Sequence, residues 1–390
     1  MYGSIRIGTI RGIPLQISAS WLIVFVLFLW TFAASYYPDR YAGWTSQAYF
    51  AAALITVVLF FASIVLHELG HATIAARSGI RTRSITLLPI GGIAEIEREA
   101  EKPGEEFAIA IAGPVTSALL GGIFIGLHFL LKPISVPVGG ITAYLGIVNL
   151  FLAVFNLLPG FPMDGGRVLR AAVWGATKSY TRGTQVAARV GSFVAYVFIF
   201  FGVTLLFRGQ IANGIILAFT GWFILTNAHA SIQQLTFQRG LGGVTVSQVM
   251  TRQFPTTQAQ QTLVQIVSET FLAQNNRYAA VEDEGRFVGF LTLADVMRVP
   301  QEQWQSVRAH AVMIPIGRLT ISHPGESALA ALERMQEGDY NQLPVIADGQ
   351  MIGLLTRNDV LRFLQLRQTL HIPSGDDDSG PPATSERVPQ

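Results

Sequence analysis

A long apolar segment that carries three ionisable residues constrains this chain more than any other feature. Residues Ala51–Ala76 are hydrophobic enough to form a helix across a bilayer, whose core is crossed by ~20 apolar residues. His67, Glu68 and His71 stand near the end of this segment in the pattern H-E-x-x-H. Residues four apart share a helix face, so both imidazoles can hold one metal ion while Glu68 faces its water. The alternative, a pair of hydrogen-bonded core histidines, leaves a carboxylate in lipid unexplained.

Similar apolar runs recur before Arg239, and after it the composition is that of a soluble protein. Charged residues make up only 13% of the sequence, whereas ordinary soluble domains have about 25%. The sequence contains no cysteine, so a metal ion would have to be held by histidine and carboxylate. We predict six membrane spans: Ala19–Ser35, Ala51–Ala76, Phe107–Leu131, Gly140–Leu158, Val186–Phe207 and Ile211–Asn227.

The basic residues between these spans predict the orientation in the membrane. Cytoplasmic connections are enriched in Lys and Arg, and here the connections after the second and fourth spans are the basic ones, whereas the opposite side holds Arg40, Lys132 and Arg208. We therefore expect both termini and the soluble part on the cytoplasmic side of a prokaryotic inner membrane. A net charge of +2, without a basic patch that includes aromatic residues, argues against a nucleic-acid partner.

Two histidines do not complete a hydrolytic zinc site, which uses three protein ligands and one open position. Asp164 is the best third ligand, because it follows the fourth predicted span at a depth that matches the two histidines. Pro159, Gly160 and Pro162 break the helix before it and let the chain turn back toward the bundle. In the alternative interpretation, Asp164 is a turn residue or a helix cap before Gly165–Gly166.

The two motifs together resemble the site-two protease family of intramembrane zinc metalloproteases. The resemblance rests on His67–His71 within a predicted span, on Asn156, Pro159 and Asp164–Gly165 after it, and on Ala112–Pro114 between them. It covers roughly residues 3–230. It implies six transmembrane helices, of which the second to fourth form the catalytic core. An inserted PDZ domain, present in some members, is absent.

The resemblance also implies a set of functional residues. One zinc ion would be held by His67, His71 and Asp164, with Glu68 as the catalytic acid and base. The substrates would be membrane-anchored regulatory proteins, cut within or near their transmembrane segments.

Two further predictions concern the surroundings of this site. Asn156 is a buried amide at the end of an apolar span, where it would stabilise an oxyanion or, equally well, tie neighbouring helices together. Residues 84–96 are rich in strand formers, with Gly91–Gly92 as the expected turn. This segment would either bind the unwound substrate along a strand edge or form a plain cytoplasmic hairpin.

The soluble part contains an internal repeat, which indicates two copies packed as one module. A set of matching positions recurs at a constant offset of 64 residues: Gly285, Gly289, Thr292, Asp295, Val296 and Arg298 match Gly349, Gly353, Thr356, Asp359, Val360 and Arg362. Each copy is predicted as helix, strand, strand, helix. The repeat resembles a tandem pair of cystathionine-β-synthase (CBS) domains over about 244–366.

The CBS resemblance makes four residues candidate nucleotide contacts: Thr292, Asp295, Thr356 and Asp359. The ligand would be ATP, ADP or AMP, acting as a regulator. In the alternative interpretation these residues only cap the helices that follow them. CBS pairs often dimerise, so a homodimer is a further expectation.

The sequence therefore predicts an all-α polytopic membrane domain of six helices (1–239), a soluble α/β CBS pair (240–368, with copies at about 244–300 and 308–366) and a disordered tail (369–390). Its predicted function is that of an intramembrane zinc endopeptidase. Two alternatives remain: a metal transporter or channel gated by the CBS pair, in which the same residues bind metal in transit, and a metal-binding scaffold without activity. Glu68 distinguishes the transporter, which needs metal ligands but no proton acceptor.

Overall fold

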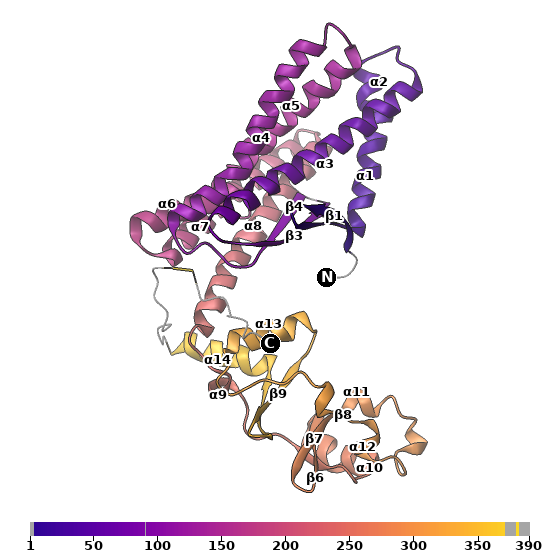
Figure 1. The fold of residues 1–390 in the computed structure, drawn as a ribbon, viewed down its shortest axis with the longest axis vertical. Helices are drawn as coiled ribbons and strands as arrows, with labels where there is room; N and C mark the ends of the chain where they lie inside the picture. The colour runs from indigo at the N-terminus through magenta and orange to yellow at the C-terminus, as the bar shows by residue number, and fades with distance from the viewer. Residues whose placement is uncertain (1–3, 90, 371–379, 382–390) are drawn as a thin grey trace. The chain divides into compact units, whose positions relative to one another are not determined.

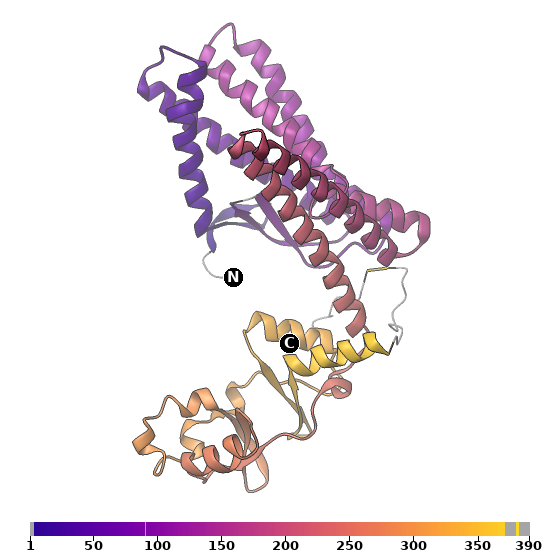
Figure 2. The same cartoon turned by 180° about the vertical axis from the view of Figure 1, so that it is seen from behind.

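The computed structural model describes residues 4–89, 91–370 and 380–381, and these form two units (Figures 1 and 2). The first unit runs to Leu235 and the second starts at Thr236, so the division falls within helix α8 (Ile211–Leu241). The tail predicted to be disordered, 369–390, lies almost entirely outside the described residues.

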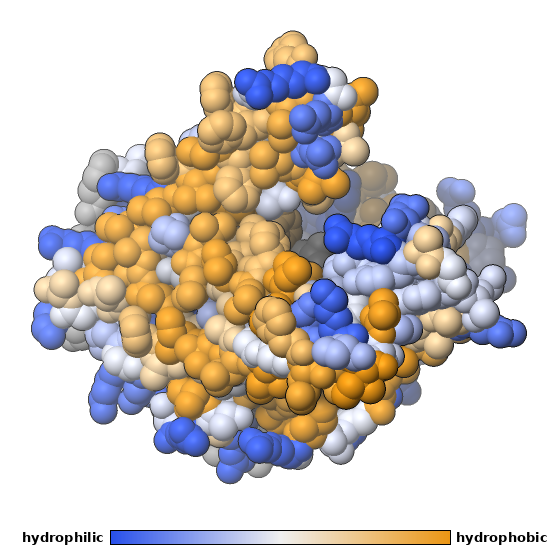
Figure 3. All heavy atoms as spheres, turned by 90° about the horizontal axis from the view of Figure 1, so that it is seen from above, coloured by the Kyte–Doolittle hydropathy of each residue, from blue (hydrophilic) through white to orange (hydrophobic). Residues whose placement is uncertain are grey.

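Six helical segments of the first unit are long and apolar enough to cross a membrane, which confirms the six predicted spans. The first, Ala19–Arg40, consists of α1 (Ala19–Thr31), a π-helical segment (Phe32–Tyr36) and α2 (Tyr37–Arg40). Large apolar side chains such as Phe151 and Phe193 lie exposed on these helices, as Figure 3 shows for one face of the molecule. The remaining spans are α3 (Ser46–Arg77), α4 (Pro103–Leu131), α5 (Val136–Asn156), α7 (Tyr180–Phe207) and α8.

A four-stranded sheet accompanies the helices, so the all-α description holds for the spans but not for the whole unit. The sheet has the order β1 (Ser4–Ile10), β2 (Ile13–Ser18), β3 (Thr82–Leu88) and β4 (Gly91–Ile96). β2 and β3 are parallel, and the other pairs are antiparallel. This sheet makes β4 an edge strand close to the end of α3.

The predicted turn at Gly91–Gly92 is wrong by a few residues. Gly91 pairs with Leu88 and Gly92 pairs with Leu87, so both glycines belong to β4 and the connection from β3 begins at Pro89. Proline lacks the N–H that a ladder needs and favours turns, which explains why the strand ends there.

The chain breaks between α5 and α6 (Asp164–Thr177), as the prolines and glycine predicted. α5 ends at Asn156, and α6 begins at Asp164. The loop packs tightly on α7, because a Cβ at Gly160 would lie 2.2 Å from the Cα of Gly191. This packing fixes the start of α6 and with it the position of Asp164.

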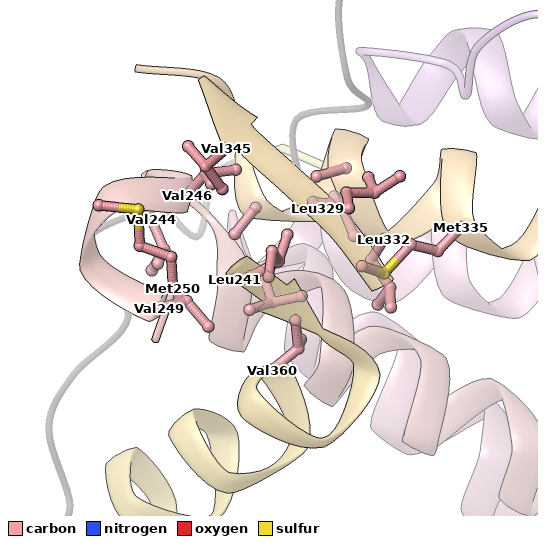
Figure 4. Packing of buried hydrophobic residues seen from close by; sticks show 14 of the residues in the cluster. Leu241, Val244, Val246, Val249, Met250, Leu329, Leu332, Met335, Val345 and Val360 are labelled. Carbon is pink, nitrogen blue, oxygen red and sulfur yellow. The ribbon is translucent and has the colours of Figure 1, made fainter. Parts of the chain in front are cut away.

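The second unit confirms the predicted repeat of helix, strand, strand, helix. The first copy contains β5 (Thr256–Gln258), α10 (Leu263–Ile266), β6 (Tyr278–Asp283), β7 (Arg286–Thr292), α11 (Leu293–Val296), α12 (Ala309–Val312) and β8 (Ile314–Pro315). The second contains α13 (Ala328–Glu337), β9 (Gln342–Ala347), β10 (Gln350–Thr356) and α14 (Arg357–Thr369), and α9 (Val246–Val249) packs with it. Figure 4 shows the apolar core of this second copy, to which Leu241, Leu332 and Val345 contribute.

The two copies share a detail of packing that the sequence offset indicated. A Cβ at Gly289 would lie 2.8 Å from the sulfur of Met313, and a Cβ at Gly353 would lie 2.5 Å from the sulfur of Met250. Each copy thus has a glycine at the same strand position, with a methionine side chain packed against it.

Candidate metal centre

His67, His71 and Asp164 converge although they come from two distant helices. The Nε2 atoms of the two histidines are 3.2 Å apart, and each lies 3.2 Å from Oδ2 of Asp164. Zinc bonds to nitrogen and oxygen are about 2.0–2.1 Å long, so the corners of a tetrahedral site lie roughly 3.3 Å apart. The three donor atoms therefore have the chemistry and the spacing of three corners of a zinc site.

The other ring nitrogens of the histidines are held by α4. His67 Nδ1 lies 2.8 Å from the hydroxyl of Ser117, and His71 Nδ1 lies 2.6 Å from the carbonyl oxygen of Ile109. A carbonyl can only accept, so Nδ1 of His71 carries the proton and Nε2 keeps its lone pair for a metal. The sequence analysis did not identify Ser117 or Ile109, although with Gly113 they form a stripe at four-residue spacing.

Gly113 of α4 lies directly against the two donor nitrogens. A Cβ at this position would be 2.2 Å from Nε2 of His71 and 2.6 Å from Nε2 of His67. The space beside the donors is therefore open because residue 113 has no side chain, as a metal site requires.

Asp164 is the first residue of α6, and its carboxylate points at the histidines. The residue before it, Met163, is the N-cap, and the distance of 3.2 Å from Oδ2 of Asp164 to Nε2 of each histidine accounts for its side chain better than a capping role does. The carboxylate of Asp164 therefore lies at the same point as both imidazoles, where it is available as a ligand.

Glu68 lines a cavity of about 550 Å³ that also contains the three donor residues. β4 passes closely over it, because a Cβ at Gly92 would lie 2.7 Å from Cγ of Glu68. Gly91 and Gly92 line the same cavity. The cavity thus places a carboxylate, a donor triad and an exposed strand edge around one space.

Asn156 also lines this cavity, but its contacts favour neither predicted role. Its amide nitrogen donates to the carbonyl of Leu152 one turn earlier in α5, 3.0 Å away. Asn149 makes the hydrogen bond between helices that was considered for Asn156. It is fully buried, and its amide donates to the hydroxyl of Ser63 in α3 at 3.2 Å.

A buried ion pair fastens α6, which carries Asp164, to α4. Arg170 donates through Nε to Oε1 of Glu106 at 2.7 Å, and its guanidinium also stacks on the rings of Phe161 and Tyr180. Arg167 lines the cavity and lies 3.9 Å from the same carboxylate oxygen. The sequence analysis missed this pair because charges 64 residues apart show no local pattern.

The four candidate nucleotide contacts form two equivalent capping boxes. Thr292 and Asp295 bond to each other's side chain and backbone at the start of α11, and Thr356 and Asp359 do the same at the start of α14. These residues therefore do cap the helices that follow them, and capping does not exclude a second role at a position that also lines a cavity. Thr292, Thr356 and Asp359 line a polar cavity of about 980 Å³, whereas Asp295 is not among its lining residues.

Comparison with known proteins gives consistent matches over most of the chain. Residues 55–139 and 132–199 match the model of peptidase family M50, and residues 246–302 and 313–366 match the CBS domain. A Synechocystis protein named as a zinc metalloprotease is 30% identical over 94% of this chain and 96% of its own length. Rip3 of Mycobacterium tuberculosis, also named as one, is 31% identical over 94% of each. The solved site-2 protease of Methanocaldococcus jannaschii is 31% identical and covers 59% of this chain and 95% of its own, with a TM-score of 0.40.

Proposed function

The chain belongs to the peptidase M50 (site-2 protease) family of zinc metalloproteases and carries a tandem CBS pair, and on this premise we propose that it is an intramembrane zinc endopeptidase. It would hydrolyse peptide bonds within or near the transmembrane segments of membrane-anchored regulatory proteins. The observation that carries this proposal is the convergence of His67, His71 and Asp164 beside Glu68 in one cavity of the membrane part.

In this proposal one zinc ion per chain is held by Nε2 of His67, Nε2 of His71 and a carboxylate oxygen of Asp164. When bound, zinc supplies Lewis acidity and a coordinated water of lowered pKa. Glu68 accepts a proton from the attacking water and delivers it to the amine that leaves. The Ile109 carbonyl keeps His71 in the tautomer that presents Nε2, and the Ser117 hydroxyl accepts the Nδ1 proton of His67 when its Nε2 binds the metal. Asn156 remains a candidate for a hydrogen bond to the oxyanion.

The substrate is proposed to bind along the free edge of β4. A transmembrane helix hides its carbonyl groups in internal hydrogen bonds, so it must become extended before it is cut. An extended segment can add as a strand to an exposed sheet edge. β4 is such an edge, and Gly92 brings its backbone close to Glu68 without an intervening side chain, while Gly91 lines the same cavity.

The remaining proposals concern regulation and placement. ATP, ADP or AMP would bind the cavity lined by Thr356 and Asp359 and adjust proteolysis, and the CBS pairs of two chains would form a homodimer. Both termini and the CBS pair would lie in the cytoplasm, with the spans in a prokaryotic inner membrane. Because the sequence contains no cysteine, a single introduced cysteine in the CBS pair reports this orientation by its labelling from one side only.

The experiment that tests the proposed activity compares wild type with Glu68→Gln and Glu101→Gln in vesicles that contain tagged single-span membrane proteins. Glu101 is an exposed glutamate outside the cavity and serves as the matched control. Wild type and Glu101→Gln should release a soluble fragment that disappears when zinc is chelated, and Glu68→Gln should release none. Transport of zinc by Glu68→Gln, with no cleavage by any of the three proteins, would support the transporter instead.

A further inference from the structure

A groove on the back of the contact between α3 and α4 has no role in the proposed function. It has a volume of about 710 Å³, and His67, His71 and Asp164 are not among the residues that line it. Its walls are apolar, and Gly70, Ala108 and Ala112 form a floor of small residues. The hydroxyls of Thr73 and Thr116 line it as well, but both donate to carbonyls of their own helices.

One end of the groove is cationic. Arg11 lines that end and lies 3.5 Å from the hydroxyl of Thr73. Arg77 follows Thr73 by four residues at the end of α3, so it projects from the same helix face. Among the residues that the structure describes, neither arginine pairs with a carboxylate. Glu105, three residues before Ala108 in α4, is 3.9 Å from Lys102.

The backbone conformation at Arg11 is unfavourable for arginine, which indicates that its side chain has a function. Arg11 and Gly12 form the turn between β1 and β2, and both have positive φ angles, of 52° and 82°. A two-residue hairpin turn of this kind strongly favours Asn-Gly or Asp-Gly, and a long side chain at the first position is unfavourable. Arginine therefore occupies a position where the local conformation selects against it.

From this groove we infer a binding site for one phospholipid with an anionic headgroup, such as phosphatidylglycerol. The groove is bounded by two membrane spans, so an acyl chain is the apolar group that reaches it. The headgroup phosphate would accept hydrogen bonds from Arg11, with Arg77 adding charge at the same level. One acyl chain would lie over Gly70 between Leu66 and Val115.

The lipid site affects the metal centre because both are built on α3 and α4. Gly70 touches α4 closely, since a Cβ there would lie 2.5 Å from Oγ1 of Thr116. In α4, Ser117 and Ile109, which hold the two histidines, directly follow the groove residues Thr116 and Ala108. A lipid in the groove would therefore support the helix packing on which the donor geometry depends.

The test measures lipid retained by the full-length protein in detergent, by native mass spectrometry, after delipidation and addition of phosphatidylglycerol or phosphatidylcholine with the same acyl chains. Arg11→Asn removes the cation and suits the turn, so it does not impair folding. Arg11→Lys keeps the charge. Val115→Trp fills the groove. The controls are Arg6→Gln, an exposed arginine of β1, and Ile147→Trp, an exposed residue of α5.

Wild type should retain one phosphatidylglycerol in preference to phosphatidylcholine. Arg11→Asn should lower that retention about fivefold, the usual contribution of one basic side chain at a membrane surface, and Val115→Trp should abolish it. Arg11→Lys and both controls should behave as wild type. Equal retention of the two lipids by wild type, or equal losses in Arg11→Asn and Arg6→Gln, would overturn the inference.

Discussion

Replacing Arg170 by methionine should destabilise the membrane part severely, because it leaves Glu106 buried without its partner. The side chain of Glu106 is only 2% exposed and that of Arg170 12%. Oε2 of Glu106 has no hydrogen-bond partner among the described residues, so Arg170 supplies most of the compensation for this charge. Removing one partner of a buried ion pair costs about 3–5 kcal/mol. A loss of 3 kcal/mol lowers the ratio of folded to unfolded protein more than a hundredfold.

The assay is the free energy of unfolding in mixed micelles, measured by titration with a denaturing detergent. The matched control is Arg98→Ala, because Arg98 forms an ion pair with Glu101 at 2.7 Å in which both side chains are exposed. Exposed pairs contribute about 0–1 kcal/mol. The double variant Glu106→Gln/Arg170→Met should recover much of the loss, because no buried charge remains.

The same variants connect stability with the metal centre. Arg170 and Asp164 belong to α6, so weakening the attachment of α6 to α4 should also lower zinc retention under conditions where the protein stays folded. If Arg170→Met and Arg98→Ala unfolded at the same detergent concentration, the reasoning about the buried pair would be refuted.

Three further predictions follow from the geometry of the two cavities. Gly113→Ala should abolish zinc binding, measured by metal analysis, because its Cβ would overlap both donor nitrogens; Gly122→Ala on the same helix, where a Cβ has open space, should bind zinc normally. Gly92→Val should stop cleavage while zinc is retained, because its side chain displaces Glu68, whereas Ile5→Val, at an exposed position of β1, should cleave at the wild-type rate. Arg362→Gln should weaken nucleotide binding to the full-length protein in calorimetry, because Arg362 lines the CBS cavity; equal weakening by Arg298→Gln, its counterpart in the first copy, would contradict the assignment.

The parts of the fold that local sequence determines were predictable. The six spans follow from hydropathy, and the break before Asp164 follows from Pro159, Gly160 and Pro162. The internal repeat followed from a constant offset, and the structure places its glycines against equivalent methionines. The meeting of Asp164 with the histidines was predictable because membrane depth limits which residues can come together.

The sheet of the first unit and the support of the metal centre were not predictable in the same way. β2 pairs in parallel with β3 some seventy residues later, and no local pattern encodes such a register. The partner of His71 is the backbone carbonyl of Ile109, and every residue has such a carbonyl, so the residue type at position 109 does not reveal this hydrogen bond. Gly113 lay within the Ala112–Pro114 motif of the family resemblance, but only the coordinates show that the histidine nitrogens fill the space where its Cβ would be.

X-ray absorption at the zinc edge, combined with zinc analysis of the purified full-length protein, tests the central claim most directly. We predict one zinc ion per chain with two imidazole nitrogens and carboxylate oxygen at about 2.0–2.1 Å. Asp164→Ala should lose the metal, and Glu68→Gln should retain it. Full zinc occupancy in Asp164→Ala, or a spectrum with a single imidazole ligand in the wild type, would contradict the assignment of His67, His71 and Asp164 as the zinc ligands.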